Sequence, residues 1–154
     1  MKRLKTAVFG ITVLAVLAFA GVGTGVASGG SSARLAAVGS GSSALGRIVV
    51  DSRGHTLYLF EKDRRGASAC SGACLVYWPP LLTSGTPTAI KGARPSLLGS
   101  IRRADGTRQV TYAGHPLYLF SGDARRGQTN GEGLKDFGAG WYVLMPSGKK
   151  IDRD

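Results

Sequence analysis

A ten-residue phrase occurs twice in this chain, first as GHTLYLFEKD at 54–63 and then as GHPLYLFSGD at 114–123. The copies lie sixty residues apart and share the pattern Tyr-x-Phe-x-x-Asp. A solenoid needs three or more units to bury its stacked faces, so a repeat present only twice favours two related halves packed against each other. The sequence therefore predicts a fold with internal pseudo-symmetry.

Each copy of the phrase has the composition of a β-strand, because Tyr, Phe and Leu dominate it and turn-forming residues flank it. Side chains alternate across a strand, so Leu57 and Leu59 face one way while Tyr58 and Phe60 face the other. Both faces are apolar, which predicts a strand in the centre of the fold. Residues 117–120 carry the same prediction.

Further strands are expected around the two phrases, at 46–51 and 107–112 and near the carboxyl end, with a hairpin at Asp105-Gly106. The expected fold class is mainly β. Two pseudo-symmetric β-meander repeats, at about 45–83 and 99–146, would pack as one small sandwich or barrel. A short helical turn is expected near Cys70 and Cys74.

The amino-terminal part of the chain has the layout of a secretory signal peptide, in which a basic start precedes an uncharged apolar run at 7–20 and small residues. The predicted division is a signal peptide at 1–27, a flexible Gly/Ser/Ala linker at 28–44 and a single β domain at 45–154. A retained membrane anchor is the alternative, but the run is shorter than the roughly 20 residues that a spanning helix needs.

The charge balance is strongly basic, with 20 Lys and Arg against nine Asp and Glu and a formal net charge of +11 at pH 7. Without the predicted signal peptide, 17 basic residues against nine acidic ones leave about +8. Such a charge can simply keep the surface soluble and self-repelling. In an exported protein the functional interpretation is adhesion to an anionic cell-envelope polymer or membrane surface. An envelope protein is the other partner class. Nucleic acid is not expected, because no binding motif for it is present.

Cys70 and Cys74 are the two cysteines of the chain, and in an exported protein such a pair is expected to be bonded. On one helical turn their Cα atoms would lie about 6 Å apart, a distance that a disulfide tolerates. Redox exchange is an alternative, although the spacing differs from the Cys-x-x-Cys of thioredoxin-like motifs. Metal or haem binding is another, although two sulfurs alone do not complete a zinc site.

His55 and His115 occupy equivalent places at the start of the two phrases. Pseudo-symmetry could bring the two imidazoles together as weak candidates for a copper site, with Cys or Met145 as a further ligand. The alternative is that each histidine forms local bonds in its own turn. No cofactor is predicted.

Asp63 and Asp123 end the two strands, where an Asp usually accepts backbone N–H groups of the following turn. Paired carboxylates can serve hydrolysis when a fold holds them together, but nothing in the sequence places these two near each other. Familiar catalytic signatures such as Gly-x-Ser-x-Gly, a Walker loop or His-Glu-x-x-His are absent. No catalytic residue is therefore predicted, and the protein is expected not to be an enzyme.

Every aromatic residue outside the predicted signal peptide lies in or beside the two repeats. Most are expected in the core, because aromatic side chains supply large buried areas in a small domain. An exposed subset could stack on sugars or on a partner, and Trp78 and Trp141 are the candidates for that role.

The two motif copies (Tyr58, Phe60 and Asp63, then Tyr118, Phe120 and Asp123) resemble the signature of a bacterial secreted-repeat family of unknown function. Its members are predicted lipoproteins with a Tyr-x-(Phe/Trp/Tyr)-x-x-Asp motif. CSGACLVYWPPL, RADGTRQVTYAGHPLYLFSGD and GWYVL strengthen the resemblance, which covers about 45–146. It implies an extracytoplasmic, cell-envelope location and no established activity. This chain has no cysteine near the predicted cleavage region, so release or loose attachment is expected in place of lipid anchoring.

The function expected from these features is a non-enzymatic binding or structural module for envelope polymers or a protein partner. The alternative is an extracytoplasmic redox or copper-handling protein that uses the cysteine pair and the histidines.

Overall fold

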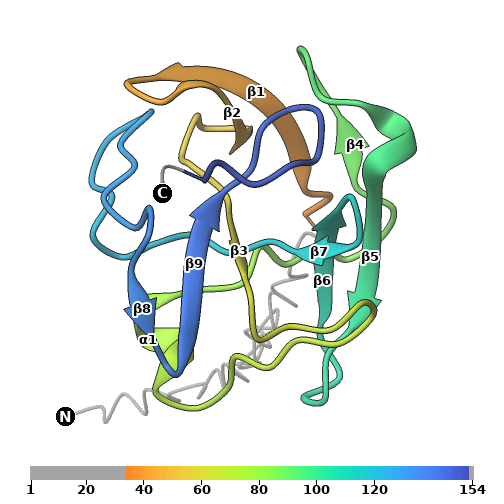
Figure 1. Ribbon diagram of the computed structural model, residues 1–154. Coiled ribbons are helices and arrows are strands. Elements are labelled where there is room, and N and C mark those ends of the chain that lie inside the picture. The colour runs from red at the N-terminus through yellow and green to blue at the C-terminus, as the bar shows by residue number, and fades with distance from the viewer. Residues whose placement is uncertain (1–33, 153–154) are drawn as a thin grey trace, which may run out of the picture. The chain divides into compact units, whose positions relative to one another are not determined.

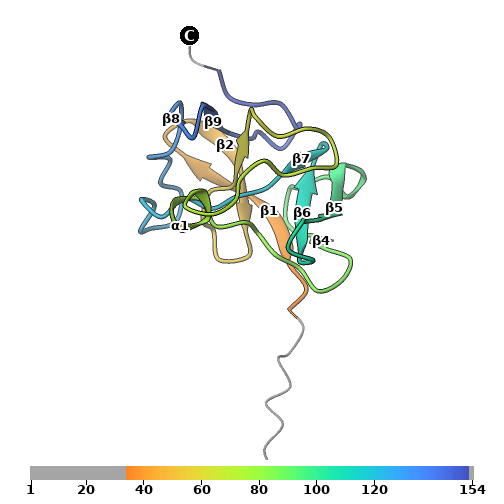
Figure 2. The ribbon, with the colours of Figure 1, turned by 90° about the horizontal axis from the view of Figure 1, so that it is seen from below.

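A computed structural model describes residues 34–152, which belong to one compact unit (Figures 1 and 2). The predicted signal peptide and the first part of the predicted linker lie outside the described residues. The fold is mainly β, as predicted, with one short helix and one 3-10 turn at Pro95–Leu97. Its elements are β1 (Ala37–Ser43), β2 (Gly46–Asp51), β3 (Tyr58–Phe60), α1 (Cys74–Tyr77), β4 (Thr88–Ala89), β5 (Leu98–Arg102), β6 (Arg108–Tyr112), β7 (His115–Pro116), β8 (Lys135–Asp136) and β9 (Ala139–Val143).

The strands form three small sheets, in the orders β2-β1-β4, β3-β9-β8 and β5-β6-β7. Within the described part of the chain they do not close into a barrel. Strand β3 runs through the middle of the molecule, between β9 and the short β7 (Figure 1). The hairpin predicted at Asp105-Gly106 joins β5 to β6, and the helical turn predicted after Cys70 is α1.

The predicted linker at 28–44 is wrong in its second half, because Ala37–Ser43 is strand β1. Six residues of β1 pair antiparallel with β2, and Val38 is completely buried. A side chain at Gly39 would press against Ile90, and one at Gly41 against Val50. The small residues that suggest a flexible tether therefore allow close packing against neighbouring side chains. Strand β1 is held in place mainly by its backbone hydrogen bonds to β2, because it has few large apolar side chains.

Hydrogen bonds reveal the pseudo-symmetry of the two repeats. The N–H of Val49 donates to the Leu144 carbonyl, and the Val49 carbonyl accepts from the N–H of Leu57. In the second repeat Val110 makes the same two bonds, to Leu81 and from Leu117. The hairpins β1–β2 and β5–β6 are thus equivalent. The hairpin of each repeat is therefore hydrogen-bonded to a residue of the other repeat, Leu144 in one case and Leu81 in the other.

The two motif strands meet at Tyr58 and Tyr118, whose N–H groups each donate to the other's carbonyl at 2.9 and 3.0 Å. Residues 58–60 form a regular ladder with β9. Residues 117–120 instead make isolated bridges, because their partner segment contains Pro79 and Pro80 and proline has no N–H to donate. Both copies are central, as predicted, but only the first is a regular strand.

The core has two parts, divided by the alternation of the motif strands. Tyr58 and Phe60 belong to one cluster, whereas Leu57 and Leu59 belong to the other. All four are at most 3% exposed. The two-faced apolar strand predicted from the sequence is therefore confirmed. Among the described residues, no helix is long and apolar enough to cross a membrane.

Candidate functional site

The motif residues bind across the repeats. The Tyr58 hydroxyl donates to Asp123 at 2.5 Å, and the Tyr118 hydroxyl donates to Asp63 at 2.8 Å. Each tyrosine thus uses the aspartate of the other motif copy. Because the two tyrosines are also paired through their backbones, the motif forms a reciprocal Tyr–Asp latch at the centre of the pseudo-symmetry.

Each aspartate of the latch also accepts the backbone N–H of a following loop, as predicted. Asp63 Oδ1 accepts from Ala69 at 2.7 Å, and Asp123 Oδ1 accepts from Asn130 at 2.9 Å. Burial raises the pKa of both carboxyl groups, against the opposing effect of these hydrogen bonds. The carboxylates line different pockets, and their oxygens are occupied in holding the loops and repeats together.

The latch predicts a specific loss of stability in alkali. Burial, aided by the neighbouring aspartates, raises the pKa of Tyr58 and of Tyr118 far above the usual value near 10. Above about pH 10 the unfolded chain therefore loses protons that the folded chain keeps, and stability falls by up to about 1.4 kcal/mol per pH unit for each tyrosine. Urea unfolding between pH 9 and 11 would measure this slope. Tyr58→Phe should reduce it, and Tyr77→Phe, at an exposed tyrosine, should not.

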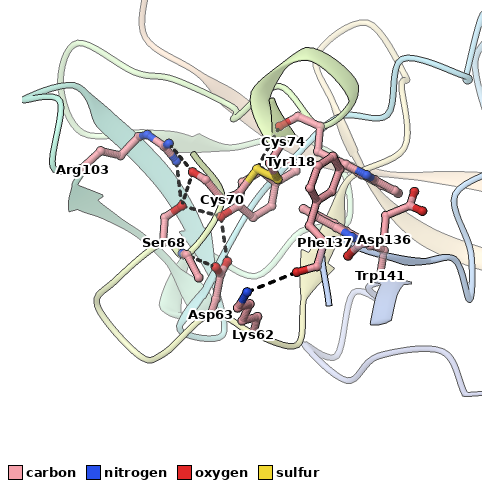
Figure 3. Close-up of a disulfide and its surroundings, with 12 residues drawn as sticks. Lys62, Asp63, Ser68, Cys70, Cys74, Arg103, Tyr118, Asp136, Phe137 and Trp141 are labelled. Atoms are coloured by element: carbon pink, nitrogen blue, oxygen red, sulfur yellow. Dashed lines mark hydrogen bonds between the residues drawn. A yellow bond between two sulfur atoms is a disulfide. The ribbon is translucent and has the colours of Figure 1, made fainter. Parts of the chain in front are cut away.

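A buried arginine supports one side of the latch (Figure 3). Arg103 is 8% exposed and donates to Ser68, to Gln109 and to the carbonyl of Cys70, at 2.6–2.8 Å. The Ser68 hydroxyl lies 2.7 Å from that of Tyr118, so the network runs from Arg103 through Ser68 to the latch. These three hydrogen bonds offset the cost of removing the guanidinium group from water. Nothing in the sequence indicates that Arg103 is buried.

Cys70 and Cys74 form the disulfide that their spacing predicts, with Cα atoms 5.5 Å apart (Figure 3). Both residues are at most 3% exposed. The bond lies at the start of α1, a helix of four residues that is too short to be stable alone. The disulfide and the Arg103 bond to Cys70 therefore fix the segment that leads to Trp78.

Trp78 and Trp141 are not surface residues, and the prediction that they are binding aromatics is wrong. Both are 0% exposed, with their rings stacked 3.9 Å apart at an interplanar angle of 5°. Phe60 stacks on Trp141 at 4.0 Å, and Phe120 stacks on Trp78 at 4.3 Å. The four rings form one column in which each phenylalanine packs on the tryptophan of the other repeat. The tryptophans are buried because the pseudo-symmetry brings two apolar faces together.

Within residues 34–152 the exposed aromatic residues are Tyr77 and Phe137, which are 53% and 39% exposed. Their ring centroids lie 6.1 Å apart, and together with Asp136 they line a pocket of about 280 Å³. Phe137 adopts a left-handed backbone, φ 57°, in the turn between β8 and β9. A bulky residue seldom adopts this conformation, and such strain is concentrated at functional positions. Sequence reasoning missed this pair, although an aromatic residue directly before the turn glycine Gly138 is a usable signal.

The two histidines line different pockets. His115 lies with Phe60 and Asp63 in a pocket of about 730 Å³, whereas His55 lies near Asp123 in one of about 280 Å³. His55 Nδ1 is 3.4 Å from an Asp51 carboxylate oxygen, as expected for a local role. Burial lowers the pKa of His115. Within residues 34–152 no group of three or more His, Cys, Asp or Glu side chains is placed to hold a metal ion.

A protein-family model described as a secreted repeat of unknown function matches the chain twice, at 39–82 and at 99–145. The two matches coincide with the pseudo-symmetric halves, and the first begins inside β1. No curated protein and no solved structure matches the chain.

Proposed function

This chain belongs to the family of secreted repeats of unknown function, and we propose that it is a non-enzymatic module that binds anionic polymers of the cell envelope. The latch residues that define the motif have their polar atoms engaged with one another and with loop backbone. They hold the fold together, so the proposed binding relies on the surface around them.

The observation that carries this proposal is that several acidic side chains are bonded within the fold, whereas most basic side chains of the described residues lie exposed on its surface. Three acidic side chains are held by hydrogen bonds within the fold, since Asp63 and Asp123 bind tyrosines and Glu132 accepts the N–H of Val143. Among the arginines and lysines of residues 34–152, Arg103 and Lys150 form ion pairs with carboxylates. Most of the other arginines and lysines in this range are exposed, and they leave a surface that attracts polyanions.

The exposed aromatic pair supports a polymer that contains sugars. Tyr77 and Phe137 offer ring faces, and Asp136 places a carboxylate in the same pocket as an acceptor for hydroxyl groups. The Lys62 ammonium donates to the Phe137 carbonyl at 3.2 Å and brings a positive charge to the turn (Figure 3). Figure 2 shows α1, which carries Tyr77, and β8, which directly precedes Phe137, on the same side of the molecule.

The proposal is tested by mixing the purified full chain with isolated cell envelopes at about 20 mM and about 500 mM salt and measuring the bound fraction. Binding that falls steeply between the two is expected, because salt screens attraction between exposed charges. Absence of binding at both salt concentrations would overturn the proposal.

Phe137→Gly should separate stability from binding. Glycine adopts a left-handed backbone without strain, so the variant is expected to gain about 1 kcal/mol in free energy of unfolding. Removal of the exposed ring should at the same time lower retention on envelope polysaccharide several-fold. The matched control is Ala113→Gly, which relieves the same kind of strain at φ 51° without removing a ring. Equal retention of the two variants would contradict a binding role for Phe137.

A further inference from the structure

A groove of about 360 Å³ lies along β1 and is lined by three basic side chains from separate segments. Arg53 comes from the turn after β2, Lys91 follows β4, and Arg126 belongs to the loop after the second motif. All three are exposed at the groove. The N–H of Gly127 donates to the Gly54 carbonyl at 3.1 Å, which fixes Arg126 next to the turn that carries Arg53.

The positive charge of the groove is not neutralised from within. Asp51 is its one acidic lining residue, and it is 9% exposed. Its carboxylate accepts the N–H groups of Arg53 and His55 at 2.8 and 2.9 Å and also faces the His55 imidazole. No ion pair within the described residues involves Arg53, Lys91 or Arg126. Three cations therefore face the groove without a carboxylate partner.

The floor of the groove offers neutral hydrogen-bonding groups. Strand β4 pairs with β1 at Ala37 and Val38, and the N–H of Ser40 then donates to the Lys91 carbonyl. Peptide groups alternate along a strand, so the peptide N–H of Ser42 points to this same side, beyond the end of β4. Ser40 and Ser42 line the groove as well. The Ser40 hydroxyl donates to the Lys91 carbonyl and accepts from Arg47, so Ser42 is the serine that offers its hydroxyl to a ligand.

The second repeat does not reproduce the three basic residues of this groove. Arg65 approaches Gly114 as Arg126 approaches Gly54, so the two arginines occupy corresponding places. The turn of the second repeat, however, has Ala113 directly before its glycine where the first repeat has Arg53. The pseudo-symmetry of the fold thus accounts for one arginine at each site, whereas the cluster of three cations is particular to the first.

We propose that this groove binds the phosphate groups of a linear, phosphodiester-linked polymer, an inference that rests on the proposed function and assigns its site. Guanidinium groups pair with phosphate through two parallel hydrogen bonds, and the Lys91 ammonium and the groups of Ser42 supply further donors. A single polymer strand can enter a groove between a strand edge and two loops. The flat headgroup layer of a bilayer cannot enter such a groove.

The test is calorimetric titration of the full chain with polyglycerol phosphate at low salt, comparing Arg126→Ser, Lys91→Gln and Arg65→Ser. Each variant removes one positive charge. Loss of a charge-assisted hydrogen bond should weaken binding about tenfold for Arg126→Ser and for Lys91→Gln. Arg65→Ser, at the corresponding place in the other repeat, should change binding less than twofold. Thermal unfolding checks that the variants remain folded.

The outcomes separate the groove from the proposed function. Equal weakening by all three variants would overturn the groove and leave non-specific attraction to anionic polymers in place. Absence of binding by the unaltered protein to the polymer and to envelopes would overturn both proposals. Tighter binding to vesicles of anionic phospholipid than to the polymer, unaffected by Arg126→Ser, would reject the groove in favour of a membrane surface. Equal binding of polyglutamate would reject the preference for phosphate.

Discussion

Replacing Trp141 by alanine is expected to lower the free energy of unfolding by about 3–5 kcal/mol, the usual cost of truncating a buried Trp or Phe. Trp141 is 0% exposed and stacks between Phe60 and Trp78, with the Tyr118 ring edge-on at 5.1 Å. Its indole N–H also donates to the Asp136 carbonyl. Because a domain of this size has only about 5–15 kcal/mol of stability in total, the variant should be marginally folded at best. Urea unfolding followed by circular dichroism measures the change.

Two further variants keep this prediction testable if Trp141→Ala does not fold. Trp141→Phe preserves part of the column and should show a smaller loss. Tyr77→Ala removes an aromatic side chain of which 53% is exposed and should cost roughly 0.5 kcal/mol or less. A Trp141→Ala variant that unfolds within about 1 kcal/mol of the unaltered protein would show that the ring column is not the main source of stability.

The second large effect concerns the latch and distinguishes contacts across the repeats from contacts within one motif copy. In a double-mutant cycle, Tyr58→Phe and Asp123→Ala should couple by about 1–3 kcal/mol, because they remove the two ends of one partly buried hydrogen bond. Tyr58→Phe and Asp63→Ala should couple by less than about 0.5 kcal/mol, although these residues belong to the same motif copy. Each single variant is expected to lose about 1–3 kcal/mol, since it leaves a polar partner unpaired.

The corresponding cycle in the other direction provides the control. Tyr118→Phe should couple to Asp63→Ala and not to Asp123→Ala, because the Tyr118 hydroxyl donates to Asp63. If both tyrosines coupled instead to the aspartate five residues ahead of them, the reciprocal arrangement would be wrong. A confirmed exchange would mean that the Tyr-x-Phe-x-x-Asp motif joins two repeats, and that neither repeat can satisfy its own motif alone.

A substantial part of the fold could be predicted from particular residues. The alternation of Leu57, Tyr58, Leu59 and Phe60 is apolar on both faces, and this pattern is sufficient to predict a central strand between two core clusters. The Asp-Gly dipeptide at 105–106 predicts its hairpin for a local reason, because glycine adopts the turn conformation without strain. The disulfide predicted from the cysteine pair is present, although Cys70 lies before helix α1 and the two cysteines do not share one helical turn.

The missed strand β1 shows where composition misleads. Its Gly and Ser residues suggest a tether, yet Gly39-Ser40 has a counterpart in Gly99-Ser100 of β5, again sixty residues later. Extending the repeat comparison beyond the aromatic phrase would have extended the domain to these residues. Side-chain content alone could not, because the energy of β1 comes largely from pairing with β2 and from packing of Val38.

The sequence by itself determined that two copies of one apolar strand exist, that each ends in an aspartate, and that the cysteines lie within bonding reach. Tertiary structure alone decided that each tyrosine binds the other repeat's aspartate, that both tryptophans are buried while Tyr77 and Phe137 are exposed, and that Arg53, Lys91 and Arg126 share one groove. The physical reason is that periodicity and turn chemistry act over a few neighbouring residues. Partner choice across a pseudo-twofold arrangement depends on where distant segments come to lie, and a repeated motif is equally compatible with pairing inside a copy or between copies.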